Sequence, residues 1–170
     1  VLVSWRSIEK MVSQSQKDHV TELPTRSVFD AHLRAECMRA RRDQHSVGVI
    51  MVDVDLFKEI NDQFGHAAGD SVLNAIGQTL RNTLRSYDMV SRFGGDEFAV
   101  LCCGCRPGEI ENTIQRLRAA MVKLQSRTSL PCPVPTVSIG ACVAHDLNTI
   151  ERPDQIIEYA DECLYFSKRE

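Results

Sequence analysis

The sequence contains no run of about 18 or more apolar residues, the length that a membrane-spanning helix needs. Its beginning also lacks the basic, apolar and small-residue order of a secretory signal. We therefore expect a cytoplasmic domain. Whether the parent protein has a membrane anchor elsewhere stays an open question.

Positive charge is not in excess either, since 20 Lys and Arg stand against 23 Asp and Glu, a formal net charge of −3. Proteins that hold nucleic acid by its phosphates usually carry a basic field. Nucleic acid is therefore not expected as a partner. Any phosphate is expected to be bound locally.

The seven cysteines are odd in number and show no repeated spacing of a disulfide framework. A reducing compartment fits this pattern best. The run Cys102-Cys103-Gly104-Cys105 has no second Cys or His pair at zinc-finger spacing. We expect small, buried, unreactive thiols.

At 170 residues and 43% apolar content, the chain is long enough for one full core and short for two domains. We expect residues 1–17 to be a linker helix from an upstream sensory domain, or an amphipathic helix resting on this domain, and residues 18–170 to be one folded domain. The linker prediction rests on a helical repeat of Trp5, Ile8, Val12 and Ser15.

Hydrophobic periodicity predicts the order of the remaining elements. The pattern is α/β in the broad sense (α+β), a ferredoxin-type βααββαβ core with a central mixed, largely antiparallel sheet flanked by helices. Two of the strands flank Gly94-Gly95, a pair suited to the positive backbone angles of a tight turn. The predicted elements are a helix after Pro24, a strand from Ser46 to Val54, a short helical piece, a helix opening at Gly69-Asp70, strands Asp88 to Phe93 and Glu97 to Cys103, a helix from Ile110 to Leu124, a strand from Thr136 to Ala144 and a helix from Ile157 to Leu164.

Acidic residues occupy the ends of two of these strands. Asp53-Val54-Asp55 closes a buried strand, where a carboxylate must be paired, protonated or bound to a cation. Asp96-Glu97 follows the glycine pair. If the two strands are neighbours, their carboxylates meet at one point, as Mg²⁺ binding requires. Each pair alone also fits a simpler explanation, a helix cap for the first and a polar hairpin tip for the second.

Between the acidic pairs, Asn61 and Asp70 are expected at opposite ends of one short helix. A carboxylate can accept from both N1–H and the exocyclic amine of guanine, a donor pair that adenine lacks. The two residues thus form a candidate guanine site. The alternative is a helix that ends at Gly65 and a cap at Asp70, with Lys58 on a solvated face and His66 stabilising a turn.

The segment Gly94-Gly95-Asp96-Glu97-Phe98, with the stretch from Asp53 to Asp70, resembles the GGDEF family of diguanylate cyclases. The likeness runs from Asp18-His19-Val20-Thr21 to Lys168 in the last helix. It implies a palm-like fold and a homodimer of domains that condenses two GTP molecules into cyclic di-GMP and pyrophosphate with Mg²⁺, for which Mn²⁺ is a substitute.

The resemblance also implies residue roles. Asp53, Asp96 and the Val54 carbonyl would bind two Mg²⁺ ions. Asp96 and Glu97 would be catalytic, with Glu97 assisting the metal site or taking the 3′-hydroxyl proton. The implied substrate contacts are Leu56, Phe57, Lys58, Asn61, Asp70, Gly94, Gly95 and Lys168.

Arg85-Ser86-Tyr87-Asp88 resembles, in composition and in spacing from Gly94, the RxxD product-inhibition site of the family. Arginine can bind a phosphate or a guanine edge bidentately, and aspartate can accept from the guanine donors. Arg116 is expected to add a contact from a neighbouring domain. The alternative is a helix end, where Arg85 suits the dipole and Asp88 caps the turn.

Two departures from the family pattern stand out. Glu22 occupies a position that is frequently glycine, and the sequence stops before the Gly-Arg-Asn that often follows the last helix, so an arginine contact to phosphate is expected to be missing. The rival functions are a catalytically silent GTP- or cyclic di-GMP-binding regulatory module and a nucleotide polymerase palm. The complete acidic signature disfavours the first, and the lack of a basic groove disfavours the second.

Overall fold

The computed structural model describes residues 16–106, 108–126 and 129–169. Five helices and four strands make up this described part. The helices are α2 (Arg26–Asp43), α3 (Phe57–Phe64), α4 (His66–Thr83), α5 (Glu109–Gln125) and α6 (Asp154–Ser167). The strands are β1 (Ser46–Val54), β2 (Met89–Arg92), β3 (Glu97–Cys105) and β4 (Val137–Ala144).

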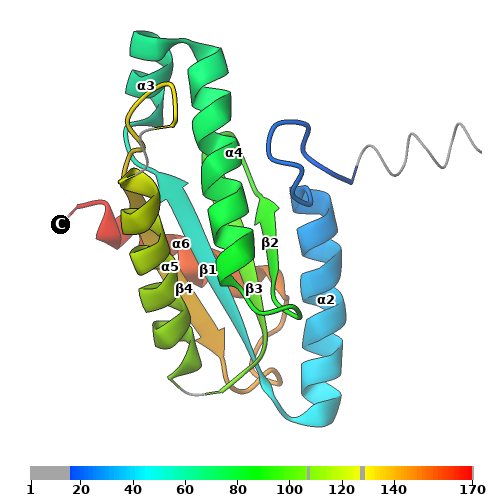
Figure 1. The fold of residues 1–170 in the computed structure, drawn as a ribbon. Coiled ribbons are helices and arrows are strands. Elements are labelled where there is room, and N and C mark those ends of the chain that lie inside the picture. Colours follow the sequence, from blue (N-terminus) through cyan, green and yellow to red (C-terminus); the bar gives the residue numbers. More distant parts are fainter. Residues whose placement is uncertain (1–15, 107, 127–128, 170) are drawn as a thin grey trace, which may run out of the picture.

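The strands form one sheet in the order β2-β3-β1-β4, and all three neighbouring pairs are antiparallel (Figure 1). Among the described residues, parallel pairing is limited to an isolated bridge between Thr25 and Arg92. The predicted α+β class and its largely antiparallel sheet are confirmed. The long central strand β1 has a partner on each side, which places its carboxyl end between β3 and β4.

Helices cover both faces of the sheet, which explains why β1 is an almost continuous apolar run. Ile50 and Val52 pack in the core under α4 and α5, whereas Val49 and Met51 pack in the core with α2 and α6. Figure 1 shows α4 and α5 on one side of the sheet and α6 behind it. The alternation of strand side chains therefore divides the interior into two apolar layers.

Gly140 of β4 lets α6 lie directly on the sheet. A Cβ atom at this position would collide with the backbone of Ala160 and Leu164, with the Leu164 Cα only 2.5 Å away. Because only glycine leaves this space, α6 passes close over β4. The end of α6 then reaches the edge of the sheet where β1 ends.

The predicted start of the second long helix was wrong. α4 begins at His66, directly after Gly65. Gly65 has a φ of 83° and is both the C-cap of α3 and the N-cap of α4. Gly69 lies inside α4, and a Cβ there would collide with Oδ1 of Asn61. This glycine therefore serves the contact between two helices, and the helix does not open at it.

Other predictions have mixed outcomes. Residues 1–15 of the expected linker helix lie outside the described residues, while Gln16 is in a turn and Lys17 bridges to Pro24. The thiols are mostly sheltered, and burial raises the pKa of Cys37 to about 11, but Cys163 is exposed. None of the described helices combines the length and apolar character of a membrane span.

Candidate active site

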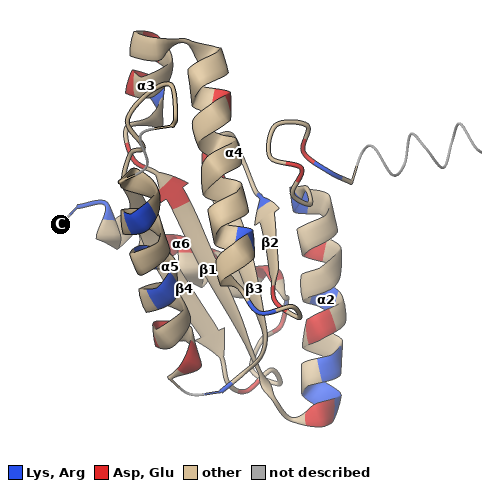
Figure 2. Cartoon of the chain, viewed as in Figure 1, with Lys and Arg blue, Asp and Glu red and all other residues tan. Residues whose placement is uncertain are grey.

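The two acidic pairs meet at the edge of the sheet where β1 ends and β3 begins. Asp53 is the cross-strand partner of Glu97 in β3 and of Ser138 in β4. The Val54 amide donates to the carbonyl oxygen of Asp96 at 3.1 Å. Figure 2 shows the acidic tip of β1 in an otherwise uncharged strand. The predicted convergence of the carboxylate-bearing segments is therefore present.

These carboxylates are crowded and partly buried. Burial raises the pKa of Asp53, which is only 8% exposed, and Asp96 and Asp55 raise it further, while the Lys168 hydrogen bond opposes the shift. Burial also raises the pKa of Glu97, with added repulsion from Asp53. The cluster therefore favours the binding of positive charge.

Lys168 supplies one such charge from the end of α6. Its Nζ lies 2.8 Å from Oδ2 of Asp53. Partial burial lowers the pKa of this ammonium group, but the hydrogen bond to Asp53 outweighs the burial, and the net direction is upward. Lys168 stays protonated beside the acidic cluster.

A cavity of about 420 Å³ opens next to this ion pair. At the wall of this cavity, the Asp55 carboxylate accepts hydrogen bonds from Thr136 Oγ1 at 2.5 Å and from Ser138 Oγ at 2.7 Å. The cavity is lined by Asp53, Asp55, Leu56, Thr136, Ser138, Ser167 and Lys168. It is polar, and a lysine and two carboxylates border it.

The start of α3 forms another side of the cavity. Leu56 has a left-handed backbone, with φ of 55°, and its side chain is exposed. The first amides of a helix have no partner within the helix, so those of Phe57 and Lys58 are suited to an anion. Lys58 itself is exposed on α3. This conformation is uncommon for a non-glycine residue.

The candidate guanine residues lie on two helices, which corrects the prediction of one. Asn61 belongs to α3 and Asp70 to α4, on either side of Gly65. The Asn61 amide rests against Gly69, the neighbour of Asp70, and Asp70 is exposed. His66 is the exposed first residue of α4. The helix junction thus brings Asn61 next to the turn that carries Asp70.

Positive backbone angles were the expected reason for glycine at positions 94 and 95, and the structure does not bear this out. Neither Gly94 nor Gly95 has a positive φ. Instead, a Cβ at Gly94 would lie 2.6 Å from Oε2 of Glu97, whereas one at Gly95 would meet nothing within 4 Å. A side chain at position 94 would therefore oblige the Glu97 carboxylate to move.

Arg92 fixes the same turn from outside. Its Nε and Nη2 donate to the carbonyl oxygen of Gly95 at 3.1 and 2.7 Å, and its Nη1 lies 2.9 Å from Oδ1 of Asp18. Asp18 also accepts from the amide of Thr21 at 2.8 Å, and Glu22 follows with a left-handed φ of 57°, consistent with a position that favours glycine. The N-terminal turn and the Gly94-Gly95 turn are thus joined by one arginine.

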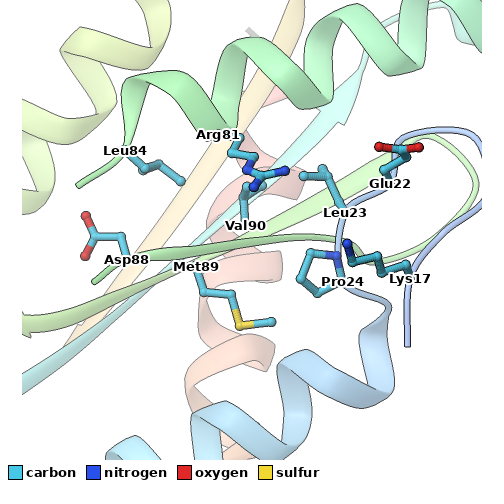
Figure 3. A pocket seen from close by; sticks show the side chains of 9 residues that line it. All are labelled: Lys17, Glu22, Leu23, Pro24, Arg81, Leu84, Asp88, Met89 and Val90. Carbon is cyan, nitrogen blue, oxygen red and sulfur yellow. The ribbon is translucent and has the colours of Figure 1, made fainter. Parts of the chain in front are cut away.

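The candidate inhibitory residues lie at the opposite end of β3. Asp88 Oδ1 accepts from the Cys103 amide at 3.3 Å, and its Oδ2 accepts from the Arg85 amide at 3.4 Å. Burial raises the pKa of Asp88, although Arg85 and Arg116 act against this shift. Arg116 is an exposed residue of α5. Asp88 also borders a cavity of about 230 Å³ that Arg81 and Met89 line (Figure 3).

Comparison with known proteins agrees with this arrangement. The sequence profile of the family described as "Diguanylate cyclase, GGDEF domain" matches residues 15–170. The chain belongs to the GGDEF domain family. The resemblance of the sequence to the GGDEF family of diguanylate cyclases is therefore confirmed.

Individual relatives of this GGDEF domain include the diguanylate cyclase TpbB of Pseudomonas aeruginosa, 34% identical over 94% of this chain and 37% of TpbB. The structure of diguanylate cyclase SiaD with its activator SiaC, also from Pseudomonas aeruginosa, has a TM-score of 0.83 and 32% identity, covering 96% of this chain and 62% of SiaD. The structure of the coiled coil and GGDEF domain of DgcB from Caulobacter crescentus, in complex with c-di-GMP, has a TM-score of 0.84 and 25% sequence identity. The match covers 96% of this chain and 86% of the DgcB chain. This chain spans little more than a third of TpbB.

A divalent metal fits the donor chemistry of this GGDEF domain. Within the described residues, no three His, Cys, Asp or Glu side chains stand close enough to hold an ion by themselves. Mg²⁺ needs only one or two carboxylates, because waters and substrate phosphates complete its shell. Asp53 and Asp96, with the Val54 carbonyl, match that requirement. Crowded carboxylates of raised pKa at Asp53 and Glu97 are the observation that supports it.

Sequence analysis missed four contributors to these sites. These are Arg92, which pairs with Asp18, Thr136 and Ser138, which bind Asp55, and Glu109, which pairs with Arg85; each partner lies far away in the sequence. A signal existed for two of them, since Thr136 and Ser138 alternate at the start of a strand and so share one face. Arg92 and Glu109 look like ordinary surface charges in the sequence.

Proposed function

We propose that this GGDEF domain condenses two GTP molecules into cyclic di-GMP, releasing two pyrophosphates. The observation that carries the proposal is the cross-strand pairing of Asp53 with Glu97 beside a cavity that Lys168 borders. In each of two equivalent steps, the 3′-oxygen of one GTP bonds to the α-phosphorus of the other. The bond from that phosphorus to pyrophosphate breaks, and the 3′-hydroxyl proton leaves.

Each proposed residue acts from the position described above. Asp53 and Asp96, with the Val54 carbonyl, would hold two Mg²⁺ ions, which when bound stabilise the charge that develops on the phosphates. Glu97 has a raised pKa and so is suited to receive the 3′-hydroxyl proton. Lys168 would move from Asp53 to the triphosphate. The remaining contacts are proposed for Leu56, Phe57 and Lys58 at the start of α3 and for the Gly94-Gly95 turn.

The base would be read at the junction of α3 and α4. The Asp70 carboxylate can accept two hydrogen bonds from guanine, and the Asn61 amide adds a further polar contact. Because adenine does not offer the same two donors, this pair would select GTP over ATP. Selectivity would thus come from residues separate from the acidic cluster.

Catalysis needs two domains, because each GTP is the nucleophile toward the other. We therefore propose a homodimer of domains as the active form, in the cytoplasm, driven by an upstream sensory domain through the linker. Product binding at Arg85 and Asp88, with Arg116 from a neighbouring domain, would hold two domains in an unproductive arrangement.

The test is incubation of the purified 170-residue chain with GTP and Mg²⁺, with cyclic di-GMP and pyrophosphate measured over a range of protein concentrations. We expect both products in a 1:2 ratio and a rate that rises faster than linearly with protein concentration. GTP binding without turnover would instead support a silent regulatory module. A rate per domain that stays constant through the dimerisation range would contradict the dimer.

A further inference from the structure

Arg85 is already engaged by an anion of the same chain. Its Nη1 lies 3.3 Å from Oε2 of Glu109, and its Nη2 donates to Oε1 of Glu109 at 3.4 Å. Two nitrogens thus face two oxygens, the paired geometry in which a guanidinium binds a carboxylate or a phosphate. Tyr87 completes the arrangement, since its hydroxyl accepts from Nη1 at 2.9 Å.

The Glu109 carboxylate is fixed at its position. Glu109 is the first residue of α5, and its Oε2 also accepts from the Arg106 amide at 2.9 Å. That backbone bond and the Arg85 pair lower the pKa of Glu109, so the carboxylate is ionised at neutral pH. A charged, anchored acid therefore covers the guanidinium group on which the proposed product site depends.

Arg85 is neutralised locally by Glu109, although other charges lie near the site. Asp88 and Arg116 are close to Arg85, Arg81 borders the same cavity as Asp88, and Arg106 acts electrostatically on Glu109. Cyclic di-GMP carries two phosphates, so it gains less from a guanidinium group that a carboxylate already neutralises. Removal of the Glu109 charge would make the site more positive by one charge and free the N–H edge of Arg85 that now faces Glu109.

We infer that Glu109 is an internal competitor for Arg85, which the phosphate of cyclic di-GMP must displace, and that this residue sets the product concentration at which the enzyme is inhibited. The inference rests on the proposed inhibitory site at Arg85 and Asp88. Displacement is feasible because the pair is partly open, with side chains 36% and 26% exposed. Partial exposure also keeps the ion pair weak enough for a ligand to break.

The experiment measures the Kd of cyclic di-GMP by isothermal titration calorimetry on the 170-residue chain, without GTP. We expect Glu109→Gln to lower the Kd about fivefold, the value of one partly exposed ion pair. The Gln side chain still accepts from the Arg106 amide. Glu111→Gln is the matched control, since it removes the same charge from the same helical turn at an exposed position, and its Kd should stay within about twofold of wild type.

The variants separate the possible failures. Binding that is lost in Arg85→Ala/Asp88→Ala but unchanged or weaker in Glu109→Gln overturns the role of Glu109 and leaves the inhibitory site standing. An equal gain in Glu111→Gln also overturns it, because the effect would then be general charge. Binding that survives in Arg85→Ala/Asp88→Ala removes the inhibitory site and this inference with it. If Glu109→Gln melts early, Glu109→Ser, which also removes the charge and leaves a hydroxyl in the first turn of α5, replaces it.

Discussion

Asp53 and Glu97 are direct cross-strand partners, so two acids of like charge face each other at the centre of the candidate site. Like charges directly opposite one another destabilise a sheet. A protein that keeps such a pair gives up stability at that position, as active sites commonly do.

Glu97→Gln is therefore expected to stabilise the metal-free protein at neutral pH. Burial, followed by repulsion from Asp53, raises the pKa of Glu97 above its ordinary 4.5. The folded state then binds the proton more tightly than the unfolded chain, so the Glu97 contribution to stability falls as pH rises from 4.5 through the raised value. Thermal denaturation should give a higher Tm for the variant at neutral pH and equal Tm values below about pH 4. A variant that melts earlier at neutral pH would contradict this account.

Asp96→Asn should abolish turnover and leave the fold intact. The Asp96 carboxylate lies at a solvent-reachable turn. The backbone carbonyl of this residue, which accepts from the Val54 amide, is retained in the variant. We expect a rate loss of about 100-fold or more and a change in unfolding free energy within about 0.5 kcal/mol. Product formation at saturating Mg²⁺ measures the rate, and a denaturant titration measures the unfolding free energy. Full Mg²⁺-dependent activity would count against Asp96 as a metal ligand.

Asp70→Ser should weaken the preference for GTP over ATP. The shortened side chain loses a charged acceptor, a change worth about tenfold to a hundredfold in selectivity. The measurement is the ratio of kcat/KM values for the two nucleotides in competition. Asp62→Ser, an equal change at an exposed position of α3, serves as the control and should leave the ratio unaltered. Unchanged selectivity in Asp70→Ser would remove this residue from the guanine site.

Arg85→Ala combined with Asp88→Ala should relieve product inhibition. Wild-type progress curves are expected to bend as cyclic di-GMP accumulates, because product bound at these residues shifts the population toward the unproductive arrangement. The double variant should stay linear until GTP is depleted. Arg118→Ala, on an exposed position of α5, controls for loss of positive charge. Equal slowing in the wild type and the double variant would show that inhibition occurs elsewhere.

Gly140→Ala should destabilise the domain through α6. A methyl group at this position would overlap the α6 backbone at Ala160 and Leu164, a form of overpacking that typically costs about 1–3 kcal/mol. Gly95→Ala is the control for stability, because a Cβ there meets nothing within 4 Å. Denaturant titration of both variants gives the comparison. A Gly140→Ala protein as stable as wild type would mean that α6 can shift away without loss.

The sequence by itself determined the class of fold and the position of the acidic residues. The apolar run ending at Asp53, the helical repeats and the turn before Asp96 are local patterns, and local patterns follow the periods of helix and strand. The family resemblance came from the same short segments.

Tertiary structure alone decided which of these residues meet and why particular glycines are needed. Lys168 reaches Asp53 because α6 passes over Gly140, and Arg92 joins the N-terminal turn to Gly95. Glu109 covers Arg85 because α5 starts beside the end of α4. Such contacts depend on strand register and helix packing between distant segments, and no local propensity encodes them.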